Sequence, residues 1–178
     1  MLEALITSKT RIKLLLKFFL NSSNTGYLRG LEPEFGESTN AIRQELNRFE
    51  AADLLLTSVE GNKKLYKANT SHPLFPEIHK LLLKHVGLDK VIEKVIKNIG
   101  DIKEVYLVGE LAKGKNSNVI DLWFVGHKLD TSYILSLAEK LQELIHRKIR
   151  YIVLNISELS EFKATKNSDE LLLLWKAE

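Results

Sequence analysis

Side chains that could read the edges of DNA bases lie in the segment from residue 38 to residue 52. Ile42, Leu46 and Phe49 recur at steps of three and four residues, which predicts a helix with one buried face. The opposite face would hold Thr39, Asn40, Arg43, Gln44 and Asn47. In the major groove, Arg can form two hydrogen bonds with guanine, and Asn or Gln two with adenine. The pattern predicts a DNA-reading helix, with an ordinary solvated helix face as the alternative.

Groups that could hold DNA phosphates flank this helix. Ser38 or Thr39 can cap its first turn, where hydroxyls can also donate to phosphate. Glu60-Gly61-Asn62 separates two extended stretches, 54–59 and 63–68, and predicts a β-hairpin. Cationic side chains on or near this hairpin are Arg29, Lys63, Lys64 and Lys67. They would face the DNA backbone, although lysines on a hairpin also protect a sheet edge.

The charge balance predicts modest DNA affinity for one copy of the chain. Residues 1–70 hold ten Lys or Arg and eight Asp or Glu, a net charge of +2. Acidic residues that would repel phosphate if they faced it are Glu32, Glu34, Glu45 and Glu50. A two-fold homodimer reading two half-sites would double the contacts. The apolar segments 12–20 and 78–86 are candidates for a dimer interface, with the protein core as the alternative.

Composition excludes several other kinds of chemistry. The 178 residues are 44% hydrophobic and 28% charged, which excludes a wholly disordered chain. The absence of cysteine excludes disulfides and thiolate sites, and His72, His79 and His85 lack the four-residue spacing of a helical metal pair. No secretory leader and no apolar run of membrane length is found, so we expect a cytoplasmic protein that binds no membrane. We also expect that the protein needs no cofactor and no metal.

The predicted elements alternate along the chain. Helices are expected at 8–20, 27–35 and 40–52, before the hairpin. Two prolines, Pro73 and Pro76, mark a boundary, and helices at 73–86 and 88–99 follow, divided by Gly87. Strands are expected at 103–108, 119–125, 149–154 and 171–175, with a long helix at 131–146 capped by Asp130 and a short one at 157–162. This order predicts an α+β fold with domains at 1–70 and 88–178 and a connecting helix at 71–87.

The first part resembles a known family. The stretch GYLRGLEPEFGESTNAIRQELNRFEAADLLLTSVEGNKKLYKANTSHPLFPEI is similar to bacterial transcription regulators of the ArsR/MarR-like winged-helix superfamily. YLRGLEPEFG matches the first helix of the motif, ESTNAIRQELNRFEAADLL the recognition helix with its lead into the wing, and NKKLYKAN the returning wing strand. The resemblance implies a winged helix–turn–helix that binds double-stranded DNA.

The second part resembles another family. VYLVGELAKGKNSNVIDLWFVG, residues 105–126, is similar to the signature of minimal nucleotidyltransferases of the DNA polymerase β superfamily. The resemblance implies a small mixed-sheet α/β domain in which two carboxylates, two residues apart on one strand, hold a divalent metal. Here those positions are Val119 and Asp121, the Gly-Ser pair is Gly109-Glu110, and the strand at 148–154 contains no acid.

These departures predict a C-terminal domain that is not an enzyme and serves dimerisation or ligand sensing. Candidate remnant ligand-binding residues are Gly109, Glu110, Lys113, Gly114 and Asp121, with Glu110 and Asp121 as an alternative metal pair. Otherwise Asp121 would pair with Lys113 or Arg150. The whole sequence predicts a transcriptional regulator with a possible small-molecule or nucleotide effector. The alternatives are a divergent metal-dependent nucleotidyltransferase and a protein-interaction module without DNA binding.

Overall fold

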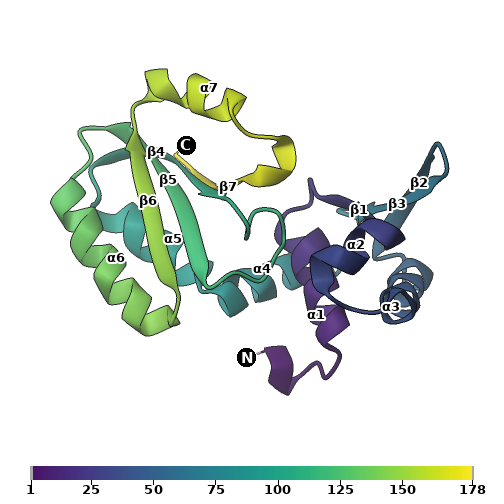
Figure 1. Ribbon diagram of the computed structural model, residues 1–178. Helices are drawn as coiled ribbons and strands as arrows, with labels where there is room; N and C mark the ends of the chain where they lie inside the picture. The colour runs from purple at the N-terminus through teal and green to yellow at the C-terminus, as the bar shows by residue number, and fades with distance from the viewer. Residues whose placement is uncertain (1, 178) are drawn as a thin grey trace. The chain divides into compact units, whose positions relative to one another are not determined.

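The computed structural model describes residues 2–177, apart from the side chains of residues 96–98, and its contacts fall into two units, Met1–His85 and Val86–Glu178. The first unit contains a three-stranded sheet with the order β1-β3-β2, and the second a four-stranded sheet with the order β6-β5-β4-β7 (Figure 1). Helices accompany both sheets. The predicted α+β class is confirmed.

The core of the first unit is built on the helix that follows Ser8. A short 3-10 helix, Leu2–Ala4, precedes α1, Lys9–Leu15, which continues into a π-helical turn, Leu16–Leu20. The Ser8 hydroxyl caps α1 by accepting a hydrogen bond from the backbone N–H of Arg11. Every side chain from Leu14 to Leu20 is buried within the unit. Of the two alternatives for the segment 12–20, residues 14–20 therefore belong to the protein core rather than to an exposed dimer interface.

Two further helices pack on this core, joined by a glycine turn. α2, Leu28–Phe35, ends at Gly36, whose φ of 62° places it in the left-handed region that glycine adopts readily. α3, Thr39–Ala51, begins at Ser38, whose hydroxyl accepts from the backbone N–H of Ala41 at 3.2 Å. Its apolar face is buried, as its spacing predicts, and the members are Ile42, Leu46 and Phe49. The two predicted helices and the glycine turn between them are therefore present.

The predicted hairpin follows α3. β2, Leu55–Glu60, pairs antiparallel with β3, Lys63–Ala68, and Gly61 turns between them with φ of 59°. A third strand, β1, Thr25–Tyr27, pairs with β3 and was not predicted. The sequence predicts a turn over residues 21–26, which the structure confirms for 21–24, and a helix that begins at Tyr27; these predictions are wrong for residues 25–27, which form strand. Three residues are too few to show strand alternation, so pairing with β3 decides their conformation.

The next two helices are separated by a glycine that no other residue could replace without strain. α4 is Phe75–Val86 and α5 is Leu88–Asn98. Gly87 between them has φ of 92°, and a Cβ there would lie 2.8 Å from Cγ2 of Ile145. Among the described residues, no helix is both long and apolar enough to cross a lipid bilayer.

The second unit is a mixed sheet. Its strands are β4, Asp101–Val108; β5, Val119–His127; β6, Lys148–Leu154; and β7, Leu171–Lys176. β5 and β6 are parallel, joined by α6, Thr131–Ile145, which Asp130 caps as predicted. β4 pairs antiparallel with β5 and with β7. The last helices are α7, Ile156–Ala164, and a 3-10 turn, Ser168–Glu170.

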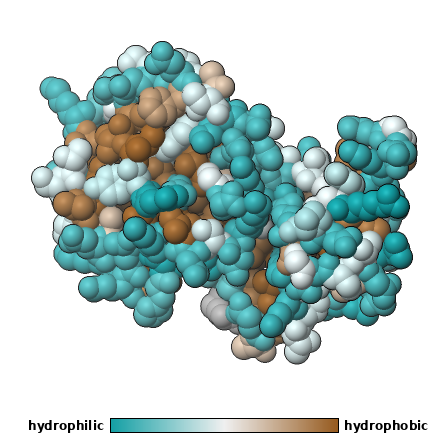
Figure 2. Space-filling view, in the orientation of Figure 1, coloured by the Kyte–Doolittle hydropathy of each residue, from teal (hydrophilic) through white to brown (hydrophobic). Residues whose placement is uncertain are grey.

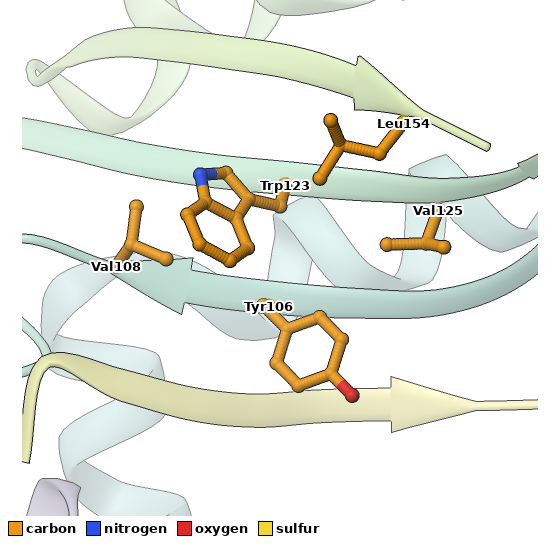
Figure 3. Close-up of a cluster of buried hydrophobic side chains, with 5 residues drawn as sticks. All are labelled: Tyr106, Val108, Trp123, Val125 and Leu154. Carbon is orange, nitrogen blue, oxygen red and sulfur yellow. The ribbon is translucent and has the colours of Figure 1, made fainter. Parts of the chain in front are cut away.

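Strand alternation divides the side chains of this sheet between its two faces. α5 and α6 pack on the face that carries Leu122 and Phe124. The opposite face carries a buried cluster made of Tyr106, Val108, Trp123, Val125 and Leu154 (Figure 3). Leu159 of α7 packs against this cluster, and the ring of Phe162 meets Trp123 edge to face at 5.7 Å. Asp121, two residues before Trp123 on β5, therefore points to the α7 side of the sheet.

Candidate nucleic-acid interface

A groove between α2, α3 and the hairpin gathers cationic and amide side chains in the first unit. Its volume is about 610 Å³, and we call it the hairpin groove. Its polar and aromatic lining consists of Tyr27, Arg29, Arg43, Asn47, Asn62, Lys63, Lys64 and Tyr66. Figure 1 shows β2 and β3 extending beyond the helices, so this groove has one wall of helix and one of hairpin. Five residues predicted from the sequence to contact DNA thus line one concave surface: Arg29, Arg43, Asn47, Lys63 and Lys64.

The helical wall presents one residue of each base-reading type. Arg43 and Asn47 are exposed and lie four residues apart, so they share one face of α3 about one turn apart. Within the described part of the chain, neither side chain makes an ion pair or hydrogen bond to another residue. Both side chains are therefore available to an external ligand.

The hairpin wall holds two lysines in different states. The Nζ atom of Lys63 lies 4.6 Å from the ring centre of Tyr27, a cation–π contact that leaves its N–H groups open. The Nζ atom of Lys64 donates to both carboxylate oxygens of Glu50 at 2.7 Å, and this hydrogen bond raises the pKa of Lys64. The charge of Lys64 is thus largely neutralised, and the pair links the end of α3 to the hairpin.

The glutamates that could repel DNA are turned to other partners. Glu45 is buried and accepts from Arg11 at 2.9 Å, from Arg48 at 3.2 Å and from Ser8 at 2.9 Å. Burial acts to raise the pKa of the Glu45 carboxyl, but the hydrogen bonds from Arg11 and Ser8 outweigh it and hold the pKa below its usual value.

Glu34 binds Lys17 at 2.9 Å in the core, and Glu37 binds Lys13 at 2.7 Å. Most of the acidic charge beside α2 and α3 is therefore compensated within the unit.

The remaining predicted contacts lie outside the hairpin groove. Asn40 and Gln44 are exposed on the N-terminal half of α3. Ser38 caps α3, and the Thr39 hydroxyl donates to Glu32 at 2.5 Å, so Thr39 is engaged within the unit. Lys67 is exposed on β3, on the strand face opposite Tyr66. These residues do not join the cluster formed by the other five.

Sequence reasoning missed three of the polar and aromatic lining residues, and each depends on local conformation. Tyr27 lines the groove because it belongs to β1, opposite Leu65 of β3. Asn62 occupies the second position of the hairpin turn, and Tyr66 is a buried residue whose edge reaches the groove. The position of Tyr66 between Lys64 and Lys67 on the predicted strand was the available signal for this residue.

A second concave site lies on the α7 side of the sheet in the second unit. Its volume is about 530 Å³, and we call it the α7 cleft; it is lined in part by Gly109, Asp121, Trp123, Arg150, Phe162 and Lys166. Arg150 binds Asp121 through two hydrogen bonds, Nε to Oδ1 at 2.6 Å and Nη2 to Oδ2 at 2.9 Å. Of the two cations predicted as partners of Asp121, Lys113 and Arg150, the structure therefore pairs Asp121 with Arg150.

Only part of the predicted ligand-binding remnant reaches this cleft. Gly109 does, with φ of 73° and so close to Asp121 that a Cβ would lie 2.8 Å from Oδ2. Lys113 instead binds Glu170 at 2.5 Å, which raises its pKa, and Glu110 binds Lys115 at 2.8 Å. Gly114 is buried in the same turn, and its N–H donates to the carbonyl of Leu111. Glu110 and Asp121 each bind a cation of the chain, so the structure does not pair them as metal ligands.

The residues of the α7 cleft do not fit the divalent metal that a nucleotidyltransferase-like fold implies. Val119 supplies no oxygen, and both oxygens of Asp121 are bound by Arg150. Among residues 2–177, no group of three or more His, Asp or Glu side chains is arranged to hold a metal ion. We therefore derive no reaction step through a metal.

Comparisons with known proteins give similarities of fold only. No protein-family model matches the chain, and no curated protein matches its sequence. Among solved structures, reduced HlyU from Vibrio cholerae is 19% identical over 47% of this chain and 82% of its own, with a TM-score of 0.37. A mutant of the MntA–HpeT toxin–antitoxin is 19% identical over 51% and 73%, with a TM-score of 0.40. A putative nucleotidyltransferase from Sulfolobus solfataricus is 23% identical over 55% and 85%, with a TM-score of 0.38.

These similarities correct one prediction. The sequence-based prediction that the chain is not an enzyme is corrected here: its structural neighbours include a protein described as a putative nucleotidyltransferase. The loss of carboxylates at the strand positions does not exclude a divergent enzyme. The chain has weak structural similarity to HlyU, to the MntA–HpeT toxin–antitoxin and to a putative nucleotidyltransferase.

Proposed function

We propose that this chain is a transcriptional regulator that binds double-stranded DNA with a winged helix–turn–helix in residues 1–70. The observation that carries the proposal is the hairpin groove, where Arg29, Arg43 and Lys63 meet with no ion-pair partner in the described part of the chain. Such a surface is suited to double-stranded DNA, because the unpaired cations can bind phosphates while the exposed helix enters a groove of the duplex.

In this proposal α3 enters the major groove. Arg43 would pair with guanine, and Asn47 one turn later would pair with adenine. Lys63 and Arg29, which line the same groove as Arg43, would hold phosphates and so fix the register of the helix on the duplex. Gln44, Asn40 and Ser38 would extend the contact toward the start of the helix.

A two-fold dimer is part of the proposal. One copy offers few phosphate contacts, because Glu50 binds Lys64 and leaves Arg29 and Lys63 as the groove cations beside Arg43. Two copies would double the contacts and read two half-sites about 34 Å apart on one face of the duplex. Residues 78–86, on α4, include the partly exposed Leu81 and are the remaining sequence-based candidate for the interface.

The test is selection from random duplexes with the purified chain, across a salt series. We expect an enriched sequence, retained at 150 mM salt, for the wild type and for Arg48→Ala. Arg48 is a matched control, because it lies on α3 outside the hairpin groove and carries the same charge as Arg43. Arg43→Ala should relax the sequence preference. A chain that enriches no sequence at any salt is a protein-interaction module or acts on another substrate.

A divergent nucleotidyl transfer is the second candidate, favoured by the position of Asp121 against Gly109 in the α7 cleft. It requires a nucleotide to enter a cleft whose carboxylate is already bound by Arg150. Transfer of label from a nucleoside triphosphate to protein or nucleic acid, lost in Asp121→Ala and kept in Lys90→Ala, would support it. Lys90 is an exposed lysine of α5 outside the cleft. Equal transfer by both variants would remove the cleft from the reaction.

A further inference from the structure

The α7 cleft combines an apolar wall with charged groups at one end. Trp123 is buried in the floor, and Phe162 and Ile152 stand beside it with 36% and 37% of their surfaces exposed. Large apolar side chains this open to solvent around a hollow are typical of a ligand site. On the face drawn in Figure 2, hydrophobic side chains of this unit reach the surface beside α7. The cleft volume of about 530 Å³ is within the range of small-molecule sites.

The charges of the cleft favour an anion. Its lining holds two cations, Arg150 and Lys166, and one acid, Asp121. A guanidinium has five N–H donors, and Asp121 takes two of those of Arg150, so three remain. The Lys166 side chain is exposed and has no ion-pair partner among the residues described. The lining therefore carries one net positive charge and unused donors.

α7 forms one side of the cleft and contacts the sheet in part through aromatic rings that a bound ligand could also contact. α7 has no buried residue. Its contacts with the sheet include the packing of Leu159 on the buried cluster and the edge-to-face contact of Phe162 with Trp123. The Nζ atom of Lys163 also lies 4.6 Å from the ring centre of Tyr106. A ring placed beside Phe162 would extend this aromatic contact, while the start of the following turn brings Lys166 to its anionic group.

We propose that the α7 cleft binds a small organic anion without a metal. An aromatic or other apolar ring lies beside Phe162 and Ile152, and one anionic group is held by Arg150 and Lys166. Asp121 competes with the ligand for Arg150 and weakens binding. In a metal site the Asp121 carboxylate would instead be needed for binding, so its effect on affinity would be the opposite. The proposal is independent of DNA binding.

The test uses a matched pair of fluorescent dyes. 8-Anilinonaphthalene-1-sulfonate has a ring system with one anionic group, and N-phenyl-1-naphthylamine is the same ring system without the sulfonate. Trp175→Phe leaves Trp123 as the only tryptophan, because the chain has two. Energy transfer from Trp123 to the dye then reports binding near this tryptophan, and the cleft variants below locate the dye; EDTA is present throughout.

We expect Arg150→Ala and Lys166→Ala to weaken binding of the sulfonated dye by about two- to fivefold, the effect of one exposed charge pair. Asp121→Asn should strengthen binding by a similar factor, and the neutral dye should respond to none of the three changes. Lys140→Ala is the control, because Lys140 lines a different groove between α5 and α6. Near-ultraviolet circular dichroism confirms that each variant keeps its tertiary packing.

Two results would overturn the proposal. The first is equal binding of both dyes, or unchanged binding in Arg150→Ala and Lys166→Ala, because then no anion is recognised. The second is loss of binding in Asp121→Asn together with a requirement for Mg²⁺, because the carboxylate would then be a ligand rather than a competitor. Neither result bears on the hairpin groove.

Discussion

The salt dependence of DNA binding can be worked out from the ion pairs of the hairpin groove. If Arg43 reads bases, Arg29 and Lys63 are the two groove cations left for phosphate, since Lys64 is bound by Glu50. Each phosphate neutralised contributes about −0.9 to the slope of log K against log salt. One protomer should therefore give a slope of about −1.8, and affinity should fall about tenfold for a fourfold rise in salt.

Two substitutions should move this slope in opposite directions. Lys63→Gln removes one phosphate contact and should change the slope by about +0.9, whereas Glu50→Gln frees Lys64 and should change it by about −0.9. A two-fold dimer would double every value. Fluorescence anisotropy with a labelled duplex, from 50 to 200 mM KCl, measures these slopes, and Arg48→Gln should leave the slope unchanged. The reasoning is refuted if Glu50→Gln and Lys63→Gln change the slope in the same direction.

Three other substitutions follow from the same structure. Arg43→Ala should reduce discrimination at one base pair by about 1–3 kcal/mol in competition binding, and Arg48→Ala should not. The pKa of Glu45 is lower in the folded chain than its usual 4.5, so its stabilisation is present above that value and is lost as pH falls through the folded pKa. Glu45→Gln should therefore flatten the acid limb of stability measured by urea unfolding between pH 3 and pH 7. Gly87→Ala should lower the free energy of unfolding by about 1–3 kcal/mol, because alanine would be strained at that φ and would meet Ile145, and an unchanged urea midpoint would contradict this.

Much of the fold could be predicted because its elements have strong local signals. α3 carries a three- and four-residue apolar repeat with a serine cap, and the hairpin has Gly61 at a left-handed position. α6 was likewise found from its repeat and from Asp130. β1 was missed because its three residues are strand only through their pairing with β3. Long-range pairing of a short segment leaves no periodicity in the sequence.

The sites were harder to predict than the elements, because side-chain pairing decides them. The sequence gives no sign that Lys64 is neutralised by Glu50 or that Thr39 is taken by Glu32. Arg150 lies 29 residues from Asp121, and the two meet only because β5 and β6 are parallel neighbours in that register. The sequence shows that Val119 replaces a carboxylate, whereas only the structure shows that Arg150 binds the remaining one, Asp121.

The central claim, that α3 reads bases in the major groove, is tested most directly by methylation protection of guanine N7 on a selected duplex. The wild type should protect a guanine that Arg43→Ala leaves reactive, at protein concentrations where both are bound, because Arg pairs with the N7 and O6 of that base. Identical protection by both proteins, or guanines that stay fully reactive in the wild-type complex, would contradict the account.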